Sequence, residues 1–403
     1  MISVGFLRPR MGIGGAERLV TDAAVCLKQR GRDVTLFVPD RMTVAQFPEL
    51  AAHKIPFERA GQFMPSHIAG RMRAPLSIAR TAYAGWRMSH SARRPDVIFS
   101  DVVPHAVPLV KRLTGRPVLY YCNYPDLLLT PEGSRTSAGY RTYRKPLDRF
   151  EADGIAAADV VVTNSRFTSR VITATFPAIP PSKLQVLYPG VRVPDGVAPR
   201  TSTDDEIVFL SVNRFDPRKN LALAVDTVSS LAALIPTETF ARVRVILAGY
   251  YDRRLPEAVA LVEELQRRAA AAGVQDRVTF AFSPSEAERQ ALMRRCRAVI
   301  YTPTAEHFGL VPLEAMAAGR PVVAVNNGGP TETVVHGTTG FLCEPSPDAF
   351  AAAMATLVND PDAADAMGRA GHHHVATHFS LDAFGNALDR LIVGLAQDAT
   401  HAS

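Results

Sequence analysis

Two glutamates, Glu306 and Glu314, stand eight positions apart around a turn that leads into helix-forming sequence. Between them lie Gly309 and Leu310, where the N–H groups of a helix start have no acceptor within the helix and can bind an anion. Carboxylates, in contrast, accept hydrogen bonds from hydroxyl groups. For either glutamate alone, a helix cap or a solvated side chain is the commoner explanation. Together these residues favour a ligand that carries both phosphate and sugar hydroxyls, such as a nucleotide sugar.

The elements around this pair predict how it is positioned. Residues 298–301 and 322–325 are apolar, β-branched runs typical of buried strands, and residues 311–318 have helix-forming composition that ends at Gly319. Strand, turn, helix and strand make a βαβ unit. Because ligands of open α/β sheets bind at the carboxyl ends of the strands, we expect the site at that edge.

A second group of residues supplies positive charge. The predicted strand 207–212 ends in Asn213 and Arg214, and Lys219 precedes a predicted helix. Two cations at a strand end and a helix start suit a diphosphate. Taken alone, the pair is equally well explained as ordinary surface charge.

The N-terminal strand, residues 2–7, runs into a glycine turn that contains Gly14 and Gly15. Such a turn lets the backbone approach a phosphate at a helix start. The rival interpretation is a dinucleotide-binding site with Asp40 as the ribose acid. It is disfavoured because Glu17 occupies the third glycine position, where close packing of helix on strand is needed.

Residues 66–94 predict a helix with an apolar face and a row of arginines beside it. Two interpretations stand equally: an interfacial helix on an anionic membrane, or a core-packed helix whose arginines reach solvent along its edge. The apolar face comprises Met72, Leu76, Ala79, Tyr83 and Trp86, and the row comprises Arg73, Arg80 and Arg87.

The bulk composition is that of a globular protein, with 403 residues, 47% apolar and 21% charged. The Pro-, Gly- and Ser/Thr-rich segment 191–206 reads as a linker. We expect an α/β protein with an N-terminal domain at 1–195, a nucleotide-sugar-binding domain at 196–380, and a C-terminal helix and tail at 381–403.

The net charge and the cysteine content limit the classes of binding partner and the cellular compartment that are expected. The net charge of +6 admits nucleic acid, anionic lipid or phosphorylated small molecules. No strand platform interleaves aromatic and basic residues, so no nucleic-acid partner is expected. Four scattered cysteines without a C-x-x-C pair, and no bilayer-spanning apolar run, indicate a cytoplasmic protein that is soluble or peripheral on a membrane.

Two patterns that could suggest a metal have simpler explanations. Residues 360–362 read D-P-D before an Ala-rich segment, which favours helix capping. Residues 372–374 are three histidines without acidic or cysteine support, so we expect no metal site.

The run from Glu306 to Glu314, E-H-F-G-L-V-P-L-E, resembles the E-x7-E motif of family 4 retaining glycosyltransferases. The longer stretch from Tyr301 to residue 345 is similar to the α-1,3/1,6-mannosyltransferases of the dolichol pathway. The resemblance implies the GT-B fold, in which two Rossmann-like doubly wound domains face a cleft and a C-terminal helix crosses back to the N-domain. It also implies a metal-independent reaction without a cofactor.

The resemblance assigns roles to the residues that match it. Glu306 is implied to bind the donor sugar, Glu314 the ribose, and Arg214 and Lys219 the leaving diphosphate, so that Glu306, Arg214 and Lys219 form the catalytic set. Residues 121–130, Y-C-N-Y-P-D-L-L-L-T, match a family run that has histidine where this chain has Asn123. Asparagine hydrogen-bonds but carries no charge. The substrate-binding set is Gly14, Gly15, Asn123, Asp126, Gly309, Leu310 and Glu314.

The implied activity is transfer of mannose from GDP-mannose to a lipid-linked mannosyl oligosaccharide or a glycolipid, forming an α-1,3 and/or α-1,6 linkage. An alternative is a family 4 enzyme that uses a UDP- or ADP-sugar. A more distant alternative is a non-catalytic nucleotide or nucleic-acid binder.

Overall fold

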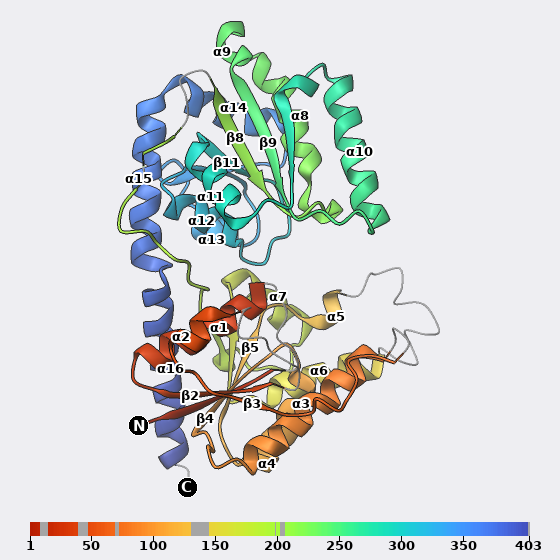
Figure 1. The fold of residues 1–403 in the computed structure, drawn as a ribbon, viewed down its shortest axis with the longest axis vertical. Coiled ribbons are helices and arrows are strands. Elements are labelled where there is room, and N and C mark those ends of the chain that lie inside the picture. The colour runs from red at the N-terminus through yellow and green to blue at the C-terminus, as the bar shows by residue number, and fades with distance from the viewer. Residues whose placement is uncertain are drawn as a thin grey trace. The chain divides into compact units, whose positions relative to one another are not determined.

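The computed structural model describes residues 1–8, 15–38, 47–68, 72–129, 145–197, 199–201 and 206–401. The chain forms two compact units, of which unit 1 comprises Met1–Gly190 with Leu381–Ser403 and unit 2 comprises Val191–Ser380. Each unit is built on a parallel sheet flanked by helices (Figure 1).

The sheet of unit 1 has the order β3-β2-β1-β4-β5-β6-β7. Since β2 lies on one side of β1 and β4 on the other, the connections reverse direction between β1 and β4, and this is where open α/β sheets bind ligands. The strands are β1 Ser3–Leu7, β2 Asp33–Val38, β3 Phe57–Arg59, β4 Val97–Asp101, β5 Val118–Cys122, β6 Val160–Thr163 and β7 Leu184–Val186.

Two apolar layers cover the sheet of unit 1. One contains residues of α1, α2 and α16, and the other contains residues of α3, α4, α6 and α7. The C-terminal helix α16 packs against α1, as the resemblance implied for a helix that returns to the N-domain. The helices are α1 Gly15–Gln29, α2 Pro48–Ala52, α3 Arg73–Ser89, α4 Val107–Thr114, α5 Asp126–Leu129, α6 Lys145–Ala157, α7 Arg166–Thr175 and α16 Leu381–His401, with 3₁₀ turns η2 Pro104–Ala106 and η5 Pro181–Lys183.

The sheet of unit 2 repeats this plan with the order β10-β9-β8-β11-β12-β13, which reverses between β8 and β11. Its strands are β8 Ile207–Val212, β9 Val243–Gly249, β10 Val278–Phe282, β11 Ala298–Tyr301, β12 Val322–Val325 and β13 Gly340–Cys343. Its helices are α8 Leu221–Ala232, α9 Thr237–Ala241, α10 Pro256–Ala271, α11 Glu286–Arg295, α12 Leu310–Ala317, α13 Pro330–Thr333, α14 Pro347–Asn359 and α15 Pro361–His378, with 3₁₀ turns η6 Pro217–Lys219 and η7 Gln275–Arg277.

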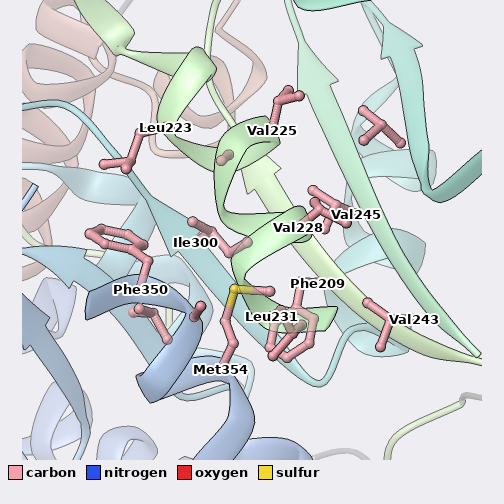
Figure 2. Close-up of a cluster of buried hydrophobic side chains, with 14 of the residues drawn as sticks. Phe209, Leu223, Val225, Val228, Leu231, Val243, Val245, Ile300, Phe350 and Met354 are labelled. Atoms are coloured by element: carbon pink, nitrogen blue, oxygen red, sulfur yellow. The ribbon is translucent and has the colours of Figure 1, made fainter. Parts of the chain in front are cut away.

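One continuous core holds the sheet of unit 2 to α8 and α14. Figure 2 shows Phe209 of β8, Leu231 and Val228 of α8, and Met354 of α14 within this core. Because this core fixes the strands, the loops at their carboxyl ends start from rigid positions.

The predicted strand–turn–helix–strand unit is confirmed by β11, α12 and β12. The last strand of unit 1, β7, ends at Val186, before Pro189. Asp360 acts as a helix cap, as expected, since its Oδ1 accepts the N–H of Ala363 at 2.9 Å.

Candidate functional site

The loop after β11 carries Glu306, and its end is shaped by Gly309. Gly309 has φ of +85° and is the N-cap of α12. A Cβ there would lie 3.2 Å from Cε1 of Tyr301, so both the backbone conformation and the space favour glycine. α12 begins at Leu310, after the loop of residues 302–309 that follows β11. Its first N–H groups have no acceptor within the helix, and they follow the strand end at which ligands of such sheets bind.

A second loop, after β12, supports the first. Cβ atoms on Gly328 and Gly329 would lie 2.4 Å from the carbonyl oxygen of Glu306 and 2.1 Å from that of Phe308. The N–H of Gly329 donates to the carbonyl of Glu306 at 2.8 Å. The two glycines thus allow one loop to pack on the other. We did not assign them to the site from the sequence, although the run N-N-G-G-P at a strand end was the signal for them.

Lys219 and Glu306 form an ion pair, with Nζ 2.5 Å from Oε2 and both side chains about four-fifths buried. Thr302 fixes the lysine from the other side by donating its hydroxyl to the carbonyl of Lys219 at 2.7 Å. Burial alone would raise the pKa of Glu306, but the charge and hydrogen bond of Lys219, with a hydrogen bond from Tyr301, outweigh it and the pKa is lowered. The carboxylate of Glu306 is therefore kept ionised and is fixed in position by its contact with Lys219.

Arg214 follows β8 and is exposed. Its Nη2 lies 3.8 Å from Oδ2 of Asp216, whereas Arg218 binds the same carboxylate with Nε at 3.0 Å and Nη2 at 2.7 Å. These contacts, led by the hydrogen bond from Arg218, lower the pKa of Asp216 to about 2. Arg218 is therefore engaged with Asp216, and Arg214 is the better placed of the two arginines to bind an added anion.

Glu314 lies on the first turns of α12 and pairs with Arg289 of α11, whose Nη1 is 2.6 Å from Oε2. Arg289 also contacts Glu286 at 2.8 Å. Burial raises the pKa of Glu314, and the charge and hydrogen bond of Arg289 act against that rise. Arg289 was missed from the sequence because it lies 25 residues from Glu314 and belongs to no motif.

In unit 1, the predicted residues that the structure describes follow β1 and β5 in the chain. Gly15 is the first residue of α1, and Gly14 lies outside the described residues, as does Asp40. Asn123 directly follows β5, and Asp126 begins α5. These positions are at the edge where the sheet order reverses or next to it.

The start of α1 is held by a buried cluster that the sequence did not predict. Arg8 donates from Nη1 to the carbonyl of Ala16 at 2.7 Å, and it pairs with Glu17 at 3.2 Å and with Asp101 at 3.3 Å. Burial raises the pKa of Asp101 to about 6, against the charge of Arg8. Glu17, which disfavoured a dinucleotide fingerprint, thus serves to anchor the helix.

The predicted arginine row on α3 is only partly present. Arg73 and Arg87 are exposed, but Arg80 is 4% exposed, because the middle of α3 packs against α4 and η2. The apolar side chains of the predicted face include exposed Met72 and Trp86. Among the described residues, no helix is both long enough and apolar enough to span a bilayer.

The site residues of unit 2 form one group that suits phosphate and a second group that suits hydroxyls. Lys219, Arg214 and the start of α12 present positive potential, which suits phosphate oxygens. Glu306 and Glu314 present carboxylate oxygens, which suit hydroxyl protons. Within the described part of the chain, no group of three or more His, Cys, Asp or Glu side chains is arranged to hold a metal ion.

Comparison with known families matches both units. Residues 13–193 match the family described as Glycosyltransferase Family 4. Residues 198–374 match the family described as Glycosyl transferases group 1.

Several curated relatives cover nearly the whole chain. The chain is 38% identical to the α-1,3/1,6-mannosyltransferase ALG2 of Mus musculus, over 98% of this chain and 96% of the relative. It is 36% identical to the protein of the same name from Dictyostelium discoideum, over 97% and 98%.

Solved structures share the fold. The Anabaena protein HepE in complex with UDP is 21% identical, with a TM-score of 0.71 over 98% of this chain and 100% of that one. Sucrose-phosphate synthase from Thermosynechococcus elongatus is 19% identical, with a TM-score of 0.74 over the full length of both chains. The predicted GT-B fold is confirmed.

Proposed function

We propose that the chain transfers mannose from GDP-mannose to a lipid-linked mannosyl oligosaccharide or glycolipid. The chain belongs to family 4 of the glycosyltransferases, within the group of α-1,3/1,6-mannosyltransferases. The new linkage is α-1,3 and/or α-1,6, with retention at the anomeric carbon. The observation that best supports this proposal is the ion pair between Lys219 and Glu306, which precedes the start of α12. The pair places a phosphate-binding cation next to a hydroxyl-binding carboxylate.

The diphosphate is the leaving group, so negative charge grows on it as the bond to the sugar breaks. Arg214, Lys219 and the N–H groups at Gly309 and Leu310 stabilise that charge. Fixed donors of this kind gain strength where water is excluded, and Lys219 is largely buried. These groups supply the electrophilic stabilisation from the chain itself, in keeping with a reaction that requires no cofactor.

The two glutamates orient the rest of the donor. Glu306 accepts hydrogen bonds from hydroxyls of the mannose, and its lowered pKa keeps it an acceptor at neutral pH. Glu314 accepts from the ribose diol. Arg289 holds Glu314 in place and offsets the burial that would neutralise it.

The chemical step follows from retention and from the groups present. The donor C1–O bond to phosphate breaks, and the acceptor hydroxyl oxygen bonds to C1 on the same face of the sugar. A phosphate oxygen of the leaving GDP takes the hydroxyl proton, so the products are the mannoside and GDP. No side-chain nucleophile is required.

In unit 1, Asn123 and Asp126 bind sugar hydroxyls, and the glycine turn before α1 contributes to binding the donor phosphate and the acceptor. Asn123 replaces a histidine of the family pattern, so its contribution is a hydrogen bond without charge. This difference predicts that the activity does not depend on protonation at position 123.

The acceptor is attached to lipid, and α3 offers a surface for the membrane. Phe63, Met72 and Trp86 are exposed, with Tyr83 between two of them at ring distances of 5.2 Å to Phe63 and 5.5 Å to Trp86. We name Phe63, Met72, Tyr83 and Trp86 the α3 patch. Exposed Arg73 and Arg87 on the same helix suit anionic headgroups, and we propose that this surface binds the membrane peripherally at its cytoplasmic face.

Donor identity is tested by titrating GDP-mannose, UDP-glucose and ADP-glucose while measuring the melting temperature of the protein. A membrane-lipid extract is then supplied as acceptor, and the mass of the product is determined by mass spectrometry. A stabilisation specific to GDP-mannose and a product heavier by one or two hexoses support the proposal. Stabilisation and turnover with a UDP- or ADP-sugar instead would favour the alternative family 4 activity. Stabilisation without turnover would favour a non-catalytic binder.

A further inference from the structure

The segment between β5 and α5, residues 123–127, is held at both ends by buried side chains from neighbouring elements. At one end, Nδ2 of Asn164 donates to the carbonyl oxygen of Asn123 at 3.1 Å. At the other, the carboxylate of Glu151 accepts the N–H of Asp126 at 2.6 Å and the N–H of Leu127 at 2.9 Å. One carboxylate thus binds two successive backbone donors, each with a different oxygen.

Glu151 is itself fixed by the way α6 is seated. A Cβ on Gly154, one turn further along α6, would lie 2.3 Å from the carbonyl oxygen of Pro104, so the helix packs closely on η2. The ring of His105 hydrogen-bonds through Nε2 to the carbonyl of Leu147 at 3.0 Å. Because α6 cannot shift without losing these contacts, the 2%-exposed Glu151 is a fixed point for the segment.

Opposing contributions set the pKa of Glu151. Burial raises its pKa to about 7, the two backbone hydrogen bonds act to lower it, and the charges of Asp126 and Asp148 add to the rise. Cys122 and Tyr120 of β5 are the other titratable groups that interact with it, and burial raises the pKa of both well above neutrality. Glu151 therefore changes its charge near neutral pH.

We propose that Glu151 is a positioning residue that fixes Asn123 and Asp126 for sugar binding by holding residues 123–127 through its carboxylate. The proposal rests on the proposed function, in which these two side chains bind sugar hydroxyls. A carboxylate accepts at both oxygens, whereas a protonated acid turns one oxygen into a donor that faces an N–H group. Protonation therefore removes one of the two contacts and loosens the segment. Activity is lost as the pH falls through about 7.

Glu151→Gln tests the proposal, since glutamine keeps the shape but presents an NH₂ group to one of the two N–H donors. We expect kcat/KM to fall about tenfold, the value of one lost hydrogen bond in a buried place. The acidic limb of the pH profile near 7 disappears in this variant. Hydrogen exchange at the Asp126 and Leu127 amides, corrected for the intrinsic pH dependence, becomes faster.

Asp159→Asn is the matched control. Asp159 also accepts a backbone N–H, that of Val118 at 2.8 Å, but at the opposite end of β5. This variant loses stability but keeps the acidic limb of the pH profile. If Glu151→Gln does not fold, exchange at the two amides of the unmodified protein between pH 6 and 8 still decides the matter, because the proposal requires protection to fall with acidification.

A Glu151→Gln protein with an unchanged acidic limb and unchanged exchange would overturn the proposal. Asn123→Ala and Asp126→Ala separate it from the function on which it rests. If both leave kcat/KM unchanged while Glu151→Gln speeds amide exchange, Glu151 holds the segment but the segment does not bind sugar.

Discussion

The Nζ atom of Lys219 lies 2.5 Å from Oε2 of Glu306, which joins the cation assigned to the diphosphate to the carboxylate assigned to the sugar. The two residues stand 87 positions apart and follow β8 and β11, the strands between which the sheet order reverses. Their pairing means that neither side chain can be changed without altering the other. Charge on the diphosphate side and hydrogen bonding on the sugar side are therefore coupled.

Lys219→Ala should lower kcat/KM by about 10²- to 10³-fold, because it removes a fixed positive charge from the departing diphosphate. It should also raise the pKa of Glu306, since burial then acts without the opposing charge of Lys219. A carboxyl with a lowered pKa contributes stability that is lost as pH falls through that pKa, so this acid-sensitive contribution of Glu306 should shrink or disappear in the variant. If the pKa of Glu306 in the variant exceeds its value in the unfolded chain, acidification through it should instead stabilise the fold. Activity and thermal unfolding are measured across pH 4–8.

The control for this change is Lys111→Ala. Lys111 also forms an ion pair at 2.8 Å, with Asp159, but it lies in unit 1, whereas Lys219 and Glu306 lie in unit 2. It should lose some stability and keep kcat/KM. Equal losses of activity in both variants would contradict a specific role for Lys219.

Arg289→Ala should raise the KM for the donor about tenfold and change kcat less, since the residue orients the ribose-binding Glu314 and does not touch the reacting bond. Without Arg289, burial raises the pKa of Glu314 further, so donor affinity should weaken at a higher pH on acidification. Arg268 is the matched control, because it likewise contacts two acids, Glu264 at 2.8 Å and Asp226 at 2.9 Å. An Arg268→Ala protein with the same rise in KM would argue against the ribose role.

Gly329→Ala should destabilise the fold by about 2 kcal/mol, because the new Cβ meets the backbone of Phe308 and cannot be relieved by a rotamer change. The melting temperature should fall by roughly 4 °C or more, and kcat/KM should fall because the Glu306 loop is displaced. Gly394→Ala provides the comparison, since nothing lies within 4 Å of its Cβ position inside α16. That change should stabilise by about 0.5–1 kcal/mol.

Trp86 is the only tryptophan in the chain, so its fluorescence reports directly on the α3 patch. Vesicles that contain anionic lipid should shift its emission to the blue, and added salt should weaken the effect because Arg73 and Arg87 contribute charge. The double change Arg73→Ser with Arg87→Ser should reduce vesicle sedimentation, whereas Leu234→Ser, an exposed apolar residue of unit 2, should not. An emission spectrum that vesicles leave unchanged would contradict membrane binding through this helix.

Local patterns were enough to predict the strand–turn–helix–strand unit, because β-branched runs, Gly309 and Gly319 act over a few residues. The cap at Asp360 was predictable for the same reason. The burial of Arg80 was not, since its spacing equals that of Arg73 and Arg87 and only the packing of α4 and η2 distinguishes it.

Site residues that belong to a sequence motif, such as Glu306 and Glu314, could be predicted from the sequence. Residues that act through the fold escaped, because their partners come from other elements: Arg289 reaches Glu314 from α11, and Glu151 reaches Asp126 from α6. Such contacts are set by packing, which a single sequence does not display.

The most direct test of the account is the product formed from GDP-mannose and a lipid-linked mannosyl acceptor, with its anomeric configuration determined by NMR. Mannose should be added in α linkage, which is retention of the donor configuration, and Lys219→Ala should form almost none of this product. A β-linked product, or transfer from a UDP- or ADP-sugar with none from GDP-mannose, would contradict it.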